Sequence, residues 1–287
     1  MSENVVASSQ HDIELNGINL HYATWGEFSV PEKAVILVHG LSANGQSMAE
    51  LGINLAQQGY FAIAPDLRGR GLSAKPPHGY GVPFHANDLL SLCDALELPK
   101  VNLVGHSLGA VISLFTGAIH PKRIGKVVLI DAGGKVPPET VNAILAAIFR
   151  IGQVYPSMAE YLDTMFQHAI YPRTPFWENY LRYDSEVYPN GTVSSRVPRA
   201  AIDEELGANS TLNGELLLTF LKQPTLIAHA TVGIVGPDTA YVLPRDEALR
   251  ISELITGSRV VAIPDSNHYT IATSEVLKQE IAAFLAE

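Results

Sequence analysis

A serine at the centre of the pentamer Gly-His-Ser-Leu-Gly, residues 105–109, carries the strongest chemical signal in the sequence. An apolar run at 101–104 precedes the pentamer and a helix-like run at 110–115 follows it, a pattern that predicts a strand turning sharply into a helix. Such a turn leaves no room for side chains two positions before and after the serine, so glycine is needed there. The helix N-terminus behind the turn favours negative charge that develops nearby. We predict that Ser107 is a nucleophile.

A serine hydroxyl is a weak nucleophile near neutral pH and needs a base within hydrogen-bond reach. His268 is the best candidate because it lies in the loop 264–269, directly after the last predicted strand. The C-terminal ends of parallel strands meet at one edge of a sheet, where active sites assemble. His106 is expected to turn away from Ser107 and to pack or bond beneath it. His39 is expected to shape the loop that supplies backbone donors to the site.

Two carboxylates are candidates for the acid that orients the histidine and stabilises its cation. Asp131 directly follows the predicted strand 126–130, one strand over from the serine. Asp238 lies ten residues past the predicted strand 225–228, in a loop rich in glycine and proline. A carboxylate on a rigid strand end is better positioned than one on a long loop. We therefore favour Asp131 as the triad acid and keep Asp238 as the alternative.

The oxyanion that forms when serine attacks a carbonyl requires two backbone N–H donors. One is expected from Leu108, the residue after the nucleophile. The other is expected from Leu41, in the loop that follows the predicted strand 34–38. Asp66 and Arg68 lie in the loop that follows the predicted strand 60–64, and we expect them to brace this loop by an ion pair with each other.

The elements that must position these residues are visible as short, continuously apolar runs, which predict strands buried on both faces. These runs lie at 34–38, 60–64, 101–104, 126–130, 225–228 and 259–263. Helical patterns alternate with them at 46–58, 83–96, 108–120, 245–255 and 274–286. A β-hairpin is predicted before them, around the turn Asn16-Gly17. The alternation predicts an α/β fold with crossover helices on both sides of a mostly parallel sheet.

One long insertion interrupts the alternation. From about residue 133 to 221 there is no strand series, only helix-like pieces broken by prolines, which is typical of a lid or cap. We predict a core formed by 1–132 and 222–287 and a helical cap at 133–221. The cap is rich in aromatic residues, most of which should form its own core. Some, such as Phe166 and Trp177, are candidates for an apolar substrate pocket.

Charge and composition restrict the partners. A net charge of −10 argues against nucleic acid and against anionic membranes, since both attract basic patches. Met1–Gln10 lacks the pattern of a signal peptide, and the single cysteine, Cys93, suits a reducing cytoplasm. The histidines show no metal-ligand spacing, so we expect no metal and no cofactor. We expect a cytoplasmic monomer or homodimer that acts on a small molecule.

Four segments together resemble the α/β-hydrolase superfamily. They are Val-His-Gly at 38–40, Pro-Asp-Leu-Arg-Gly-Arg-Gly-Leu-Ser at 65–73, the serine pentamer at 105–109 and Asn-His-Tyr at 267–269. The resemblance covers nearly the whole chain outside the insertion and implies an eight-stranded, mostly parallel sheet, a helical cap and a Ser-His-acid triad. The chain lacks the Gly-x-x-Asp that commonly follows the seventh strand. Some relatives carry the acid after the sixth strand, as Asp131 would.

This resemblance favours a serine hydrolase that cleaves a carboxylic ester or lactone through an acyl-enzyme. Haloalkane dehalogenases and epoxide hydrolases carry aspartate where this chain has Ser107, which argues against both chemistries. Hydrolysis of a C–C or amide bond on the same triad is the alternative. A basic residue of the cap would then hold a substrate carboxylate, and the candidates are Arg150, Arg173, Arg182, Arg196 and Arg199. A ligand receptor without catalysis is a third hypothesis. Selectivity depends on cap residues that the sequence cannot place.

Overall fold

The structure is a computed structural model that describes residues 8–167 and 172–287. The predictions for Met1–Gln10 therefore concern residues that lie mostly outside the described part. Within the described residues, eight strands form one sheet in the order β1-β2-β4-β3-β5-β6-β10-β11. In chain order these strands are β1 (Ser9–Leu15), β2 (Ile18–Trp25), β3 (Ala34–Val38), β4 (Phe61–Pro65), β5 (Val101–His106), β6 (Ile124–Ile130), β10 (Thr225–Ala230) and β11 (Arg259–Ile263).

The sheet is mostly parallel, as predicted. β2 pairs antiparallel with both β1 and β4, whereas all other neighbours in the sheet run parallel. The hairpin turn between β1 and β2 places Asn16 and Gly17 at φ 53° and 75°. Positive φ at both central residues is what the tight hairpin turn requires, and Asn-Gly tolerates it best.

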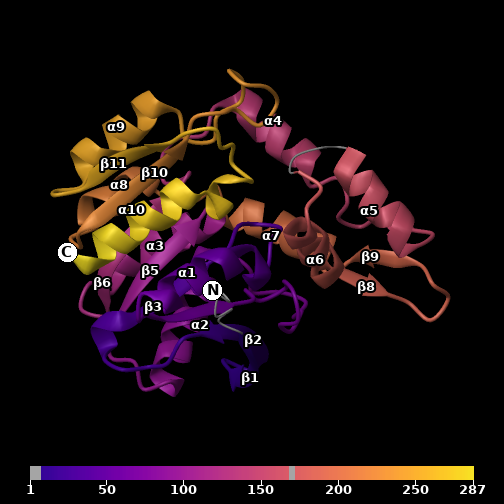
Figure 1. The fold of residues 1–287 in the computed structure, drawn as a ribbon, viewed down its shortest axis with the longest axis horizontal. Helices are drawn as coiled ribbons and strands as arrows, with labels where there is room; N and C mark the ends of the chain where they lie inside the picture. Colours follow the sequence, from indigo (N-terminus) through magenta and orange to yellow (C-terminus); the bar gives the residue numbers. More distant parts are fainter. Residues whose placement is uncertain (1–7, 168–171) are drawn as a thin grey trace, which may run out of the picture.

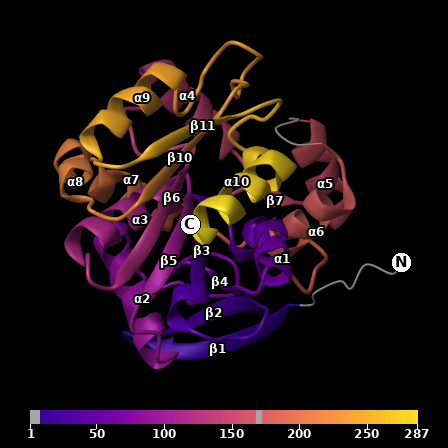
Figure 2. The ribbon, with the colours of Figure 1, turned by 60° about the vertical axis from the view of Figure 1, so that its left-hand side comes forward.

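Helices cover both faces of this sheet (Figure 2). One face carries α1 (Ala49–Gln57) and α10 (Glu275–Ala286). The other face carries α2 (Val82–Ala95), α3 (Leu108–Ile119), α8 (Gly214–Phe220) and α9 (Arg245–Leu254). The two-sided cover explains the continuously apolar strands. In β3, Ile36 packs toward α2 and α3 while its neighbour Leu37 packs toward α1 and α10.

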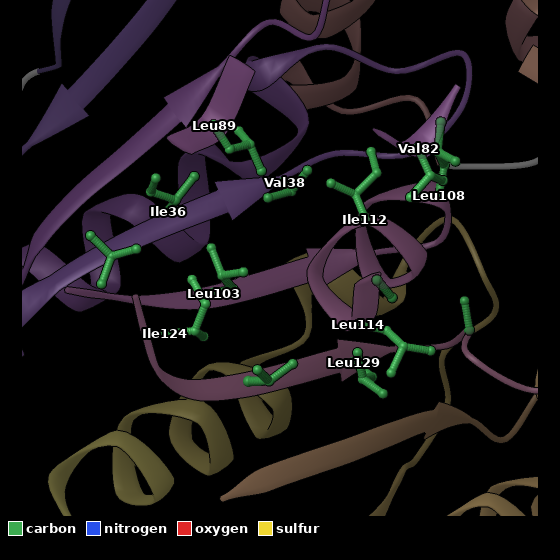
Figure 3. Close-up of a cluster of buried hydrophobic side chains, with 14 of the residues drawn as sticks. Ile36, Val38, Val82, Leu89, Leu103, Leu108, Ile112, Leu114, Ile124 and Leu129 are labelled. Atoms are coloured by element: carbon green, nitrogen blue, oxygen red, sulfur yellow. The ribbon is translucent and has the colours of Figure 1, made fainter. Parts of the chain in front are cut away.

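The core between the sheet and α3 holds the serine turn in place. Figure 3 shows Ile36, Leu103 and Leu129, from three adjacent strands, facing Ile112 of α3. These four side chains are at most 1% exposed. Burying each of them stabilises the fold by about 1.5–3 kcal/mol. The strand before Ser107 and the helix after it are therefore anchored independently of the site.

Most of the segment between β6 and β10 lies to one side of the large sheet, whereas its last helix, α8, packs on the sheet (Figure 1). The segment contains α4 (Pro138–Ala147), α5 (Met158–Gln167), α6 (Pro175–Asp184) and α7 (Arg199–Asn209), and also the short strands β7 (Val154–Tyr155), β8 (Ser185–Val187) and β9 (Val193–Ser195). The three strands form a small antiparallel sheet that the sequence pattern does not predict. Strands of two or three residues are too short to show an alternating pattern.

This segment has an apolar core of its own, built around Tyr161, Trp177 and Leu181. The division into a core (1–132 and 222–287) and a cap (133–221) remains our proposal. At its end, α8 contributes Leu217 and Leu218 to the main core cluster. None of the described helices has the length and apolarity needed to cross a bilayer.

Candidate active site

Ser107 sits on the sharp turn between β5 and α3. Its backbone angles, φ 57° and ψ −121°, lie in a region that residues other than glycine rarely adopt. A Cβ added to Gly105 would lie 2.1 Å from the Gly109 carbonyl oxygen, and one added to Gly109 would lie 2.0 Å from the Val38 carbonyl oxygen. Both contacts are impossible, so the predicted need for two glycines is confirmed.

A continuous line of hydrogen bonds joins three of the residues chosen from sequence. Ser107 Oγ lies 2.9 Å from His268 Nε2, and His268 Nδ1 lies 2.8 Å from Asp131 Oδ2. A carboxylate can only accept, so Nδ1 carries the histidine proton and Nε2 is left to accept from the serine hydroxyl. The Asp131 and His268 side chains are buried. In this arrangement the imidazole can take the serine proton.

The alternative acid lies elsewhere. Asp238 occupies an exposed turn, bracketed by the bridge between Gly236 and Thr239. The Nδ1 side of His268 is occupied by Asp131. The structure therefore brings Asp131, and not Asp238, to the histidine.

The loop after β3 lies directly against the serine. A Cβ on Gly40 would be 3.2 Å from Ser107 Cβ, so only glycine lets this backbone approach so closely. His39 is fully buried, and its Nδ1–H donates to the Gly40 carbonyl oxygen at 2.8 Å while its Nε2 accepts from the Leu67 N–H at 3.0 Å. In a trans peptide the N–H points opposite to the C=O, so this bond turns the Leu41 N–H away from His39.

Burial lowers the pKa of His39 to about 3, so this ring is neutral at physiological pH. The second expected donor, Leu108, is the first residue of α3. An N–H at the start of a helix has no acceptor within the helix and remains available to a ligand. Leu41 and Leu108 thus flank Ser107 with backbone amides from two different elements.

His106 makes a hydrogen bond, as predicted, although its side chain also borders the site. It lines the same cavity as Ser107, and its ring centroid lies 4.7 Å from that of His268. Burial lowers the pKa of His106 to about 3, so the ring is neutral at physiological pH. Its Nε2 lies 2.8 Å from the His268 carbonyl oxygen, which can only accept, so the ring proton is on Nε2. His106 therefore ties the end of β5 to the loop that carries His268, a role that the sequence pattern did not reveal.

A small cavity of about 70 Å³ opens above Ser107. Ligand pockets usually measure about 300–1,000 Å³, so this one admits only a small group. The insertion closes it with apolar side chains from the end of α4, namely Ile144, Ala147 and Ile148, and with Tyr180 of α6. The two aromatic residues chosen from sequence lie elsewhere: Phe166 and Trp177 pack within the apolar core of the insertion.

Arg150 also lines this cavity, close to the loop after β3. Its Nε donates to Asp184 Oδ2 at 3.1 Å and its Nη2 donates to the Ser42 carbonyl oxygen at 2.6 Å. Asp184 is fully buried and balances the guanidinium charge. Arg150 is one of five cap arginines that the sequence suggests for a substrate carboxylate, and it is the one of the five that lines this cavity.

The predicted ion pair between Asp66 and Arg68 is wrong. Arg68 pairs with Asp88 of α2, through Nε at 2.7 Å and Nη2 at 2.6 Å. Asp66 accepts backbone N–H groups instead, from Gly45 at 2.7 Å and Leu72 at 2.8 Å. The two side chains leave the loop in different directions, so each braces it against a different element.

In the described part of the chain, no group of three or more His, Cys, Asp or Glu side chains is arranged to hold a metal ion.

Comparisons with known proteins agree with this architecture. The family model for the alpha/beta hydrolase fold matches residues 33–274. The chain is 26% identical over 255 residues to 2-(acetamidomethylene)succinate hydrolase of Mesorhizobium japonicum, a match that covers 88% of this chain and 87% of the relative. The crystal structure of E-2-(acetamidomethylene)succinate hydrolase superposes with a TM-score of 0.84 at 23% identity, covering 98% of this chain and 100% of the other.

Another relative matches a shorter part of the chain at higher sequence identity. An uncharacterized protein of Mycobacterium tuberculosis is 36% identical over 115 residues. That match covers 40% of this chain and only 33% of the relative's length.

Proposed function

The chain belongs to the α/β-hydrolase family, and on this premise we propose that it is a serine hydrolase that cleaves a carboxylic ester or lactone through an acyl-enzyme. The observation that carries the proposal is the unbroken line of hydrogen bonds from Asp131 through His268 to Ser107. A nucleophile, a base in reach of it and a group that orients the base are the three parts that acyl transfer requires.

In the first half of the reaction, Ser107 Oγ attacks the carbonyl carbon while His268 Nε2 takes the hydroxyl proton. Asp131 holds the ring by Nδ1 and stabilises the imidazolium that forms. The carbonyl oxygen becomes negative and accepts from the Leu41 and Leu108 N–H groups. Each preorganised donor of this kind lowers the barrier by roughly 3–4 kcal/mol. His268 then returns the proton to the leaving alcohol, and the acyl group stays on the serine.

In the second half, water replaces the alcohol. His268 takes a proton from the water, the hydroxide attacks the acyl carbon, and Ser107 leaves with the proton that the histidine returns. For a lactone the leaving alcohol remains part of the same molecule, and the steps are otherwise unchanged. The reaction consumes one water and requires no cofactor.

The decisive experiment uses p-nitrophenyl acetate and a fluorophosphonate that reacts with activated serines. The purified protein should hydrolyse the ester and gain one phosphonyl group by mass spectrometry. Ser107→Ala should lose both properties while keeping its thermal unfolding midpoint. Labelling on another residue, or turnover that survives in Ser107→Ala, contradicts the proposal. A protein that binds small acyl compounds without turning over any of them, and that resists phosphonylation, would be the receptor considered above.

A second candidate is amide or C–C hydrolysis on the same three residues, with a substrate carboxylate near Arg150. Arg150 lines the cavity above Ser107 and so could meet an anionic substrate. A relative that matches over 88% of this chain is named 2-(acetamidomethylene)succinate hydrolase. Hydrolysis of 2-(acetamidomethylene)succinate that is faster than that of simple esters, and that is lost in Arg150→Met, would favour this candidate over an esterase.

A further inference from the structure

Arg70 is a charged residue in the interior of the molecule that the proposed reaction does not use. It lies in the loop after β4, and its side chain is completely buried. Its Nη2 donates to Glu205 Oε2 at 3.1 Å. Glu205 belongs to α7 of the insertion, and its side chain is also completely buried. The pair therefore joins the large sheet's loop to a cap helix in the interior, where neither charge meets water.

The same guanidinium holds the loop beside the nucleophile. Arg70 Nε donates to the Leu41 carbonyl oxygen at 2.9 Å, and Nη1 donates to the Arg68 carbonyl oxygen at 3.0 Å. Three of its nitrogens thus serve three different partners. The planar fork fixes their relative positions better than a single ammonium could.

The bond from Arg70 to the Leu41 carbonyl oxygen fixes one of the two peptide units that flank Leu41. His39 holds the carbonyl of Gly40, which belongs to the peptide that contains the Leu41 N–H. Arg70 holds the carbonyl of Leu41, which belongs to the following peptide. Peptide units are rigid planes, so fixing both of them fixes the φ and ψ of Leu41. The direction of the Leu41 N–H is then set by two side chains and not by the loop alone.

Glu205 is what keeps Arg70 in place. It also accepts from His85 Nε2 at 2.6 Å and from Asn209 Nδ2 at 3.2 Å. Burial lowers the pKa of His85, so that ring is a neutral donor and the charge of Arg70 is balanced by Glu205 alone within this cluster. A buried guanidinium without its counter-charge is costly and would be drawn toward water. Moving α7 away would therefore also loosen the hold of Arg70 on Leu41.

We propose that Arg70 is a positioning residue that couples the seating of cap helix α7 to the geometry of the oxyanion hole. With Glu205 in place, Arg70 holds the Leu41 peptide, and the N–H points at the oxyanion. With α7 displaced, the donor loses its direction. The inference rests on the proposed function only in taking Leu41 as an oxyanion donor.

A second, partly buried link between cap and core provides a control. The Tyr183 hydroxyl, on α6, donates to Asp66 Oδ2 at 2.6 Å. This bond also fastens the insertion to the loop after β4, but it does not involve Leu41. A general effect of cap docking predicts similar losses in Arg70→Lys and Tyr183→Phe. Coupling to the oxyanion hole predicts a loss in Arg70→Lys alone.

The test measures the rate constant of Ser107 phosphonylation by a fluorophosphonate, together with kcat and KM for p-nitrophenyl acetate, in the full-length protein. Arg70→Lys and Glu205→Gln should lower the phosphonylation rate and kcat by about 10- to 100-fold, the loss expected from a misplacement of about 1 Å, with KM unchanged. Affinity for a trifluoromethyl ketone, which forms an oxyanion on the serine, should fall in parallel. Tyr183→Phe should match the wild type.

Glu205→Gln leaves the buried charge of Arg70 unpaired, and Arg70→Lys keeps the charge but loses donors in the interior, so a loss of folding has to be controlled for. The double variant Arg70→Met/Glu205→Met removes both charges, and such apolar replacements often keep a protein folded. It should keep its thermal unfolding midpoint and still show the loss of rate. A wild-type rate in the double variant, or an equal loss in Tyr183→Phe, overturns the coupling.

The two proposals fail in different ways. A wild-type protein that is phosphonylated on Ser107 but cleaves no ester refutes the proposed function, and the coupling is then decided by the phosphonylation rates. A wild-type protein that is not phosphonylated at all refutes both.

Discussion

Asp131 is held by the backbone around it. It follows β6 with a φ of 49°, and its own N–H donates to the Ala228 carbonyl oxygen at 2.7 Å. Its Oδ1 accepts from the Ala230 N–H at 3.0 Å, which leaves Oδ2 directed at His268. A carboxylate fixed at one oxygen loses little freedom when the other orients a histidine. Asp131 at its strand end is therefore better placed for the proposed role than Asp238 in its exposed turn.

Asp131→Asn therefore tests the assignment of the acid. The amide keeps the shape of the side chain but can present an N–H to His268 Nδ1, which favours the tautomer whose Nε2 is protonated. That tautomer cannot accept the serine proton. We expect kcat for p-nitrophenyl acetate to fall by about 10⁴-fold, as in other triads.

Asp238→Asn is the matched control, since it makes the same chemical change at an exposed position, and it should keep wild-type turnover. A loss of turnover in Asp238→Asn with normal turnover in Asp131→Asn would reverse the assignment.

At the scale of whole elements, local patterns predicted most of what positions the site. Burial on both faces makes each core strand continuously apolar, so β3 (Ala34–Val38) and β11 (Arg259–Ile263) have the bounds predicted from sequence. The serine turn was also predictable from a local pattern, because its glycines lie two positions before and after Ser107. These features depend on residues that are neighbours in sequence.

The remaining features depend on contacts between distant residues. Arg70 and Glu205 are 135 positions apart, and no local pattern pairs them. The ion pair predicted between Asp66 and Arg68 was wrong because Arg68 reaches Asp88, 20 positions away, on a helix packed beside the loop. The residues that line the pocket were not predicted, because they too come together only through contacts between distant parts of the chain. Phe166 has the right chemistry for it, but only the folded insertion decides which apolar side chains face Ser107.

Helix α4 sets the size of the group that can reach Ser107. Ile144 lines the cavity of about 70 Å³, whereas Val141, one turn earlier, is 41% exposed and does not. We expect the wild type to prefer p-nitrophenyl acetate to the butyrate and octanoate esters in kcat/KM. Ile144→Ala should raise the butyrate-to-acetate ratio about tenfold, since one or two methylenes in an apolar pocket are worth about 1–3 kcal/mol.

Val141→Ala shortens a side chain of the same helix without touching the cavity, and it should leave this ratio unchanged. A wild type that prefers octanoate, or an Ile144→Ala variant with an unaltered ratio, would show that α4 does not limit the acyl group.

At the scale of the whole molecule, the site makes the fold sensitive to acid. His39 is fully buried and His106 is 8% exposed, and burial lowers the pKa of each to about 3. In the unfolded chain a histidine has a pKa of about 6.5. Between these values the unfolded state binds protons that the folded state excludes. The free energy of unfolding must therefore fall as the pH falls from about 6.5 toward 3.

Each such histidine contributes a slope of at most about 1.4 kcal/mol per pH unit in this window. Urea unfolding at several pH values between 7 and 4 measures the slope directly. His106→Asn should reduce it by about one histidine's contribution, because the variant has no imidazole to protonate at this position. His120→Asn, at an exposed position after α3, is the matched control. If His106→Asn and His120→Asn change the slope equally, burial of His106 within the site does not account for the acid sensitivity.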